Sequence, residues 1–270
     1  MERPYVIERH KSYTPKPEPC LSSPTAPSGF LIGDQTMPKK LDIVYILKEE
    51  LDTDELRYSL RSVEENFPHR FVWFIGGQPK GFHPDRFIKH KQVGETKWDM
   101  IKSSMWQAVN NEEVSDDFFL FNDDFFVMKK FKGEFINYVD MTLADRIDEL
   151  RRNVHPWLNP YGRTLFKAEQ ELLSQGCPTM NYDVHLPMLF NKELFKTSIN
   201  KCSSPQMRSV YGNLNSIPFV IHPDVKVYSM ETVPEDPDFL STNDDVFKQG
   251  RVGAYIREQF SQPCKYEGEG

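Results

Sequence analysis

The sequence predicts an α/β fold in which a mostly parallel sheet is flanked by helices, with a more helical C-terminal part. Residues 41–47 (LDIVYIL) form an apolar run typical of a buried strand, and residues 56–67 then carry apolar side chains at helical spacing. Residues 71–75 (FVWFI) and 118–121 (FFLF) are two further buried-strand patterns, separated by another helical pattern. Strands that alternate with helices are typical of a parallel sheet covered on both faces.

The first half of the chain also shows where its elements begin and end. Asp52 and Glu55 have the spacing of a capping box, and Pro68 is expected to end the helix that follows. Thr96 is a plausible cap for a helix that contains Trp98 and Met105. The expected elements are a strand at 41–47, a helix at 53–67, a strand at 71–75 closed by Gly76-Gly77, a weaker strand near 87–93, the helix after Thr96, and a strand at 118–121. The apolar run resumes at 125–128.

The second half predicts more helix and less regular structure. Thr164 is expected to cap a helix that ends at Ser174, and Pro187 is expected to begin a helix that runs to Lys196. Short strands are expected at 219–221 and 225–228, followed by one or two helices within 243–260.

Composition narrows the class of protein. The 270 residues carry a formal net charge of −7, which gives no general attraction to nucleic acid, although a local basic groove is compatible with it. No apolar stretch is long enough to cross a membrane, and the polar start lacks a signal-peptide pattern. The four cysteines form no CxxC pair, so we expect free thiols and a cytoplasmic protein.

Residues 1–39 differ in composition from the rest of the chain. They hold seven of the 20 prolines and show no hydrophobic periodicity. We therefore expect an extended N-terminal arm, followed by a single domain over residues 40–270.

The most informative pattern is Asn122-Asp123-Asp124, which lies between runs of phenylalanine. Adjacent carboxylates are costly to bury unless something compensates their charge, and Mg²⁺ or Mn²⁺ would do so. The ends of parallel strands are where ligands gather in open α/β sheets. We expect Asp123 and Asp124 to hold a divalent metal on the diphosphate of a nucleotide donor, with Asn122 beside them. A simple turn that uses Asn and Asp for backbone geometry is the alternative.

Two further patterns suggest functional side chains. Arg57 and Arg61 share one face of the first helix with Ser62 beside them, so they could grip phosphate oxygens or form an ordinary solvated face. Asp183 and His185 lie on one side of an extended segment. There the carboxylate could make the imidazole a base for an acceptor hydroxyl, or the histidine could be structural.

In this order the segments resemble the Stealth family, which includes bacterial capsular polysaccharide phosphotransferases and N-acetylglucosamine-1-phosphotransferase. The matching residues are Asp42-Ile-Val-Tyr45, the segment Glu55–Ser62 (ELRYSLRS), the apolar strand that ends in Asn122-Asp123-Asp124, and His185-Leu-Pro187. The second and third matches are specific, and the resemblance covers roughly residues 41–128 and, more loosely, 180–215.

The resemblance implies a core related to the GT-A glycosyltransferases, a nucleotide-sugar donor and transfer of hexose 1-phosphate to a hydroxyl acceptor such as a glycan. It implies functional roles for Asp42, Arg57, Arg61, Asp123, Asp124 and His185, with a nucleotide-sugar-binding half at 40–130 and an acceptor half at 131–270. The family's insertion before ELRYSLRS is missing here, because Ile46–Asp52 runs almost directly into the helix. Transfer of the sugar alone therefore stays open.

Two other classes compete with this hypothesis. One is a non-catalytic carbohydrate-binding relative, and the other is a phage-type glycosyltransferase that modifies a hydroxylated DNA base. The C-terminal Ser241–Phe247 segment also resembles a tail found in small glycosyltransferases, from which Asp244 or Asp245 could reach the site or cap a helix.

Overall fold

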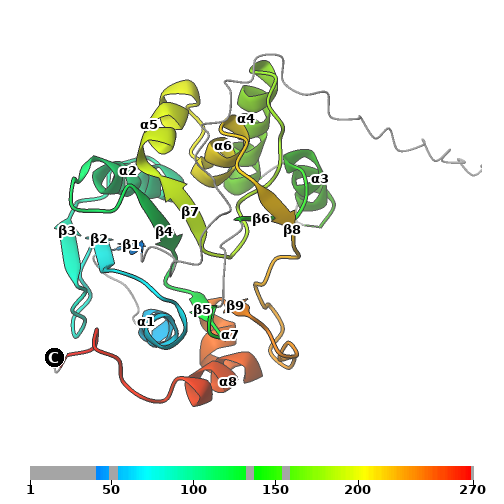
Figure 1. Cartoon of the computed structure of the whole chain (residues 1–270). Coiled ribbons are helices and arrows are strands. Elements are labelled where there is room, and N and C mark those ends of the chain that lie inside the picture. The colour runs from blue at the N-terminus through cyan, green and yellow to red at the C-terminus, as the bar shows by residue number, and fades with distance from the viewer. Residues whose placement is uncertain (1–40, 49–53, 132–136, 154–158, 269–270) are drawn as a thin grey trace, which may run out of the picture. The chain divides into compact units, whose positions relative to one another are not determined.

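A five-stranded sheet forms the centre of the computed structural model, which describes residues 41–48, 54–131, 137–153 and 159–268 (Figure 1). The strand order is β3-β2-β1-β4-β7. The first four strands run parallel, and β7 is antiparallel to β4. The predicted α/β fold with a mostly parallel sheet is confirmed.

The elements follow the chain in the order shown in Figure 1. The strands are β1 (Asp42–Leu47), β2 (Val72–Gly76), β3 (Arg86–Lys89), β4 (Asp117–Phe121), β5 (Phe125–Val127), β6 (Asn137–Val139), β7 (Met188–Asn191), β8 (Phe219–Ile221) and β9 (Phe239–Ser241). The helices are α1 (Asp54–Asn66), α2 (Lys97–Asn110), α3 (Leu143–Asn153), α4 (Pro160–Ser174), α5 (Lys192–Lys201), α6 (Met207–Leu214), α7 (Asp244–Gln249) and α8 (Arg251–Gln259).

Alternating side chains of β1 face two separate hydrophobic clusters, one on each side of the sheet. Ile43, Tyr45 and Leu47 pack with the apolar face of α1, whereas Val44 joins the cluster that includes residues of α2, α5 and α6. Side chains of a strand alternate between faces, so one apolar strand supplies both clusters. Both faces of the sheet are therefore covered.

The C-terminal part builds a smaller core beside α1. Phe126 of β5 and Leu240 of β9 pack with Val246, Phe247 and Ile256 of the last two helices. Strands β5 and β9 pair antiparallel and form a separate two-stranded sheet. This pairing brings the segment near residue 241 beside the residues that follow β4.

Asp42 is fully buried at the amino end of β1, where it joins three parts of the chain. Its carboxylate accepts hydrogen bonds from the guanidinium of Arg70 at 2.6–2.7 Å, from the Trp73 indole at 2.9 Å and from the Ser115 amide at 2.9 Å. Burial alone would raise the pKa of Asp42, but these hydrogen bonds hold it below its usual value. The carboxylate is thus a structural hub for the start of the sheet.

Two predicted helix starts are wrong. Helix α4 begins at Pro160 rather than after Thr164, because the Asn159 side chain caps it by accepting a hydrogen bond from the Gly162 amide at 2.8 Å. Residues after Pro187 form strand β7 before α5 begins. The reason is a long-range pairing, in which Phe190 lies opposite Phe118 of β4, and local sequence does not show it.

Other expectations agree more closely. Thr96 and Asp99 form the expected capping box of α2, and Gly76 closes β2 with a φ of 109°. A Cβ at Gly76 would lie 2.2 Å from the Leu47 carbonyl oxygen, so glycine is required there. Residues 225–228 are joined to β9 by an isolated bridge between Lys226 and Ser241 instead of forming a strand. The predicted N-terminal arm and Asp52 lie outside the described residues.

Within the described part of the chain, every helix is too short or too polar to span a bilayer. The Lys129 ammonium lies between the carboxylates of Asp236 and Asp238, at 2.8 and 3.0 Å. Its charge is therefore balanced by two carboxylates. Cys202 and Cys264 are buried free thiols.

We predict that Asp42→Asn lowers the free energy of unfolding by about 3 kcal/mol, because the new amide nitrogen would face donors on every side. Urea denaturation at pH 7 measures this change. Asp148→Asn, on the exposed side of α3, is the matched control, and we expect it to change stability by less than about 0.5 kcal/mol. Equal changes in the free energy of unfolding for the two substitutions would contradict the structural role of Asp42.

Candidate functional site

The turn Asn122–Asp124 lies at the carboxyl end of β4, which lies between β1 and β7 in the sheet. Buried Phe121 and Phe125 fix its two ends, and the Phe125 amide donates to the Asn122 carbonyl at 3.3 Å. The Ser59 hydroxyl on α1 donates to the Phe125 carbonyl at 2.6 Å. The turn is therefore anchored to both the sheet and α1, at the edge where ligands bind in open α/β sheets.

The Asp124 carboxylate has one satisfied and one unsatisfied oxygen. Its Oδ2 accepts hydrogen bonds from the Lys226 ammonium at 2.7 Å and from the Ser241 hydroxyl at 3.1 Å. Its Oδ1 is buried and has no hydrogen-bond partner among the described residues. A buried oxygen of this kind costs free energy unless a ligand binds it.

Further acids crowd this turn. Burial, together with the nearby carboxylates of Asp124, Asp244 and Asp123, raises the pKa of Glu55 to about 8, although a hydrogen bond from Thr242 acts in the opposite direction. Burial and the neighbouring Asp124 raise the pKa of Asp123 to about 6. The site therefore concentrates negative potential where a cation would bind.

These residues fit a divalent cation that shares its coordination sphere with a substrate. In the described ranges no group of three or more His, Cys, Asp or Glu side chains is arranged to hold a metal by itself. Mg²⁺ commonly takes only one or two carboxylates and completes its shell with phosphate oxygens and water. Asp123 and the unpartnered Oδ1 of Asp124 would supply that part of the shell.

His185 is oriented by Asp224. Its Nδ1 lies 2.7 Å from Asp224 Oδ2, and its backbone amide donates to Asp224 Oδ1 at 3.1 Å. Burial alone would raise the pKa of Asp224, but the His185 contacts hold it below its usual value. An ionised Asp224 accepts a hydrogen bond from Nδ1–H, and this tautomer leaves Nε2 as the ring nitrogen that can accept a proton.

Asp183, the expected partner of His185, makes a different contact. Its Oδ2 accepts a hydrogen bond from the Tyr161 hydroxyl at 3.0 Å. The role expected for Asp183 beside the imidazole is therefore filled by Asp224, 39 residues after His185.

One continuous set of contacts joins the two predicted site segments. Asp224 Oδ1 also accepts from the Lys226 amide at 3.2 Å, and the Lys226 ammonium reaches Asp124. Buried Arg208 adds a second link, because it donates to the Leu186 carbonyl at 2.7 Å and to Asn122 Oδ1 at 3.3 Å. The structure thus brings His185 and the acidic turn together.

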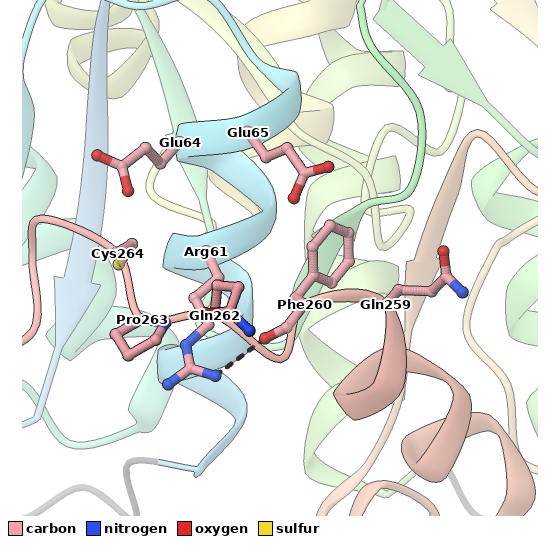
Figure 2. Close-up of a pocket in the computed structure, with 8 residues that line it drawn as sticks. All are labelled: Arg61, Glu64, Glu65, Gln259, Phe260, Gln262, Pro263 and Cys264. Carbon is pink, nitrogen blue, oxygen red and sulfur yellow. Dashed lines mark hydrogen bonds between the residues drawn. The ribbon is translucent and has the colours of Figure 1, made fainter.

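Arg57 and Arg61 lie on another face of α1 and do not join this site. Both pair with Glu267, with Arg61 Nε at 2.6 Å, and Arg61 also donates to the Phe260 carbonyl at 2.9 Å (Figure 2). The pocket in Figure 2 lies between α1 and the segment after α8, and its lining contains neither Asp124 nor His185. Both guanidinium groups therefore anchor the C-terminal segment.

Ser62 and Asp42 also have structural partners. The Ser62 hydroxyl donates to the Ser59 carbonyl at 2.7 Å and accepts from the Val127 amide at 3.0 Å, so it ties α1 to β5. Asp42 lies at the amino end of β1, opposite Phe118, which begins the buried part of β4. The acidic turn follows the other end of that strand, so Asp42 is not brought to the site.

Several site residues were missed by sequence reasoning. Glu55 lies in the ELRYSLRS segment but was expected only to cap a helix, and Arg208, Asp224 and Lys226 carry no local motif that marks them. The spacing of Asp224 and Lys226 offered one signal, since alternate residues of an extended segment point the same way. Asn243, rather than an aspartate, caps α7, and Asp244 lies near Glu55.

No protein-family model matches the chain, and no curated protein matches it in sequence. The resemblance to the Stealth family thus depends on the motifs alone. Among solved structures the chain is similar to the galactosyltransferase LgtC in complex with donor and acceptor sugar analogues, at 10% identity and a TM-score of 0.47, over 83% of this chain and 97% of that one. It is also similar to the glycosyltransferase GlyE of Streptococcus pneumoniae TIGR4, at 9% identity and a TM-score of 0.37, over 83% and 60%. These values are too low to carry a functional conclusion.

We predict that Glu267→Gln lowers stability by about 2 kcal/mol at pH 7 without weakening ligand binding at the acidic turn. Burial would raise the pKa of Glu267, but hydrogen bonds from Arg61, the Cys264 amide and Arg57 lower it to about 2. Its contribution is fully present above about pH 4.3, the ordinary glutamate pKa, and is lost as the pH falls through the folded value.

Urea denaturation at a series of pH values measures this effect, and we expect the difference from wild type to narrow below about pH 4. Glu65→Gln is the control, because Glu65 is exposed on α1, the helix that carries Arg57 and Arg61. If a fully stable Glu267→Gln protein lost nucleotide-sugar binding, the conclusion that Arg57 and Arg61 lie outside the donor site would be wrong.

Proposed function

We propose that this protein is a nucleotide-sugar-dependent transferase that moves a sugar or sugar 1-phosphate to a hydroxyl acceptor, with Mg²⁺ or Mn²⁺ at Asp123 and Asp124. The observation that supports it best is the continuous set of contacts from His185 through Asp224 and Lys226 to Asp124. It joins a potential proton acceptor to a carboxylate with an open oxygen. A simple turn requires neither feature.

The donor side of the proposal uses the acidic turn. Asp123 and Asp124 would hold the cation, which when bound supplies charge stabilisation to the diphosphate. Lys226 and the buried Arg208 add positive charge near the turn, and Asn122 is fixed in place by Arg208. Positioned charges of this kind stabilise negative charge that develops on a leaving group.

The acceptor side uses His185. Its Nε2 would take the proton of the acceptor hydroxyl as that oxygen attacks the donor. Asp224 holds Nδ1–H, fixes the tautomer and stabilises the imidazolium that forms. Residues of 40–130 would thus carry the donor side and those of 131–270 the acceptor side, with Lys226 crossing between them.

Attack at the anomeric carbon transfers the sugar alone, whereas attack at the β-phosphorus transfers sugar 1-phosphate. An isotopic label on the β-phosphate of the donor separates the two reactions, since it enters the glycosylated product only in the second. The acceptor is expected to be a glycan or another hydroxyl-bearing polymer.

We predict that one nucleotide-sugar raises the melting temperature by about 5 °C at saturation, and that this shift requires Mn²⁺ or Mg²⁺. Asp124→Asn should remove the metal-dependent part, because the amide replaces a ligand oxygen. Asp148→Asn serves as the control. The absence of any shift across UDP-, GDP-, CMP- and dTDP-sugars, with and without metal, would contradict the proposal.

We predict that His185→Gln and Asp224→Asn each lower kcat by about 10² to 10³ while donor affinity stays within about twofold. The double variant should be little worse than either single one, because the two residues act as a unit. Steady-state kinetics and donor titrations measure this. Additive losses, or a loss of donor affinity alone, would show that the histidine does not act as a base.

If the chain were a non-catalytic carbohydrate-binding protein, the results of these experiments would be different. Such a protein would bind ligand, turn over no donor and tolerate Asp224→Asn. The DNA-modifying alternative would add salt-sensitive duplex binding.

A further inference from the structure

Lys226 forms an ion pair with a carboxylate of the acidic turn. Its ammonium lies 2.7 Å from Asp124 Oδ2, and the two side chains are only 14% and 15% exposed. This ion pair balances part of the negative charge of the acidic turn.

The Lys226 backbone is fixed although its side chain is long. The next residue, Val227, donates its amide to the Ser241 carbonyl at 2.8 Å, and the Lys226 amide donates to Asp224. A four-carbon stem on a fixed backbone can move its ammonium by several ångströms through rotamer changes alone. The head group can thus leave Asp124 without any change in the fold.

Asp124 presents its second oxygen differently. Oδ1 is buried and has no partner within the described ranges, so Lys226 neutralises one oxygen of the carboxylate and leaves the other open. A divalent cation that bound there would stand beside the Lys226 ammonium, and the two positive charges would repel each other. A bound diphosphate would remove this conflict, because its oxygens attract both cations.

We propose that Lys226 partly occupies the cation position of the donor-free protein and moves onto the donor diphosphate when metal and donor bind together. This inference depends on the proposed function and adds a mechanism of coupling to it. A metal ion alone would bind weakly, because the Lys226 ammonium repels it. The diphosphate would attract the ammonium away from Asp124. Metal and diphosphate would therefore each raise the affinity of the protein for the other. A purely structural ion pair would produce no such coupling.

The test measures binding of two simple probes, Mn²⁺ alone and inorganic pyrophosphate in the presence of Mn²⁺. Electron paramagnetic resonance counts free Mn²⁺, and calorimetry gives the pyrophosphate affinity. We expect Lys226→Met to bind Mn²⁺ alone about tenfold more tightly than wild type and Mn²⁺-pyrophosphate about tenfold more weakly. Lys226→Arg, which keeps the charge, should retain weak binding of Mn²⁺ alone.

Lys129→Met is the matched control, since Lys129 pairs with two aspartates elsewhere on the surface and should change neither affinity. Folding of each variant is checked by its thermal transition, and Lys226→Gln replaces Lys226→Met if the latter is unfolded. Unchanged or weaker Mn²⁺ binding in folded Lys226→Met or Lys226→Gln overturns the inference alone. Failure of wild type and of every Lys226 variant to bind either probe overturns the proposed function as well.

Discussion

The parallel pairing of β4 with β1 is the constraint on which the other features depend. It places a strand of phenylalanine residues in the middle of the sheet, so that both faces of β4 are buried. The chain can therefore turn toward solvent only where β4 ends, and it does so at Asn122–Asp124. Burial of the strand and the position of the acids are thus two results of one arrangement.

The site is completed by segments that contribute no strand to the central sheet. Pairing of β5 with β9 brings Ser241 to Asp124, and the extended segment beside β9 carries Lys226 and Asp224. Asp224 then fixes His185, which lies just before β7. The small C-terminal core consequently has a second role besides stability, since it sets the distance between the acidic turn and the histidine.

Strong local patterns predicted the strands β1, β2 and β4, the cap of α2 and the place of the acidic turn. They failed where pairing between distant strands determines the secondary structure. The residues after Pro187 were expected to be helical, but they form β7, in which Phe190 pairs with Phe118 of β4. The same limit applies to the site. Arg57 and Arg61 have a helical spacing that suits a phosphate, yet their partner is Glu267, more than 200 residues away in sequence. Lys226 and Asp224 belong to the site because of long-range contacts with Asp124 and His185.

The attachment of residues 260–268 to α1 has a consequence for biosynthesis. Glu267 follows Arg61 by 206 positions, so a growing polypeptide makes both arginines long before it makes the carboxylate that pairs with them. Domains assemble as the ribosome extends them from the amino end. In this protein the two arginines of α1 lack their Glu267 partner until translation reaches that residue, so the outer face of α1 is completed only at the end of synthesis.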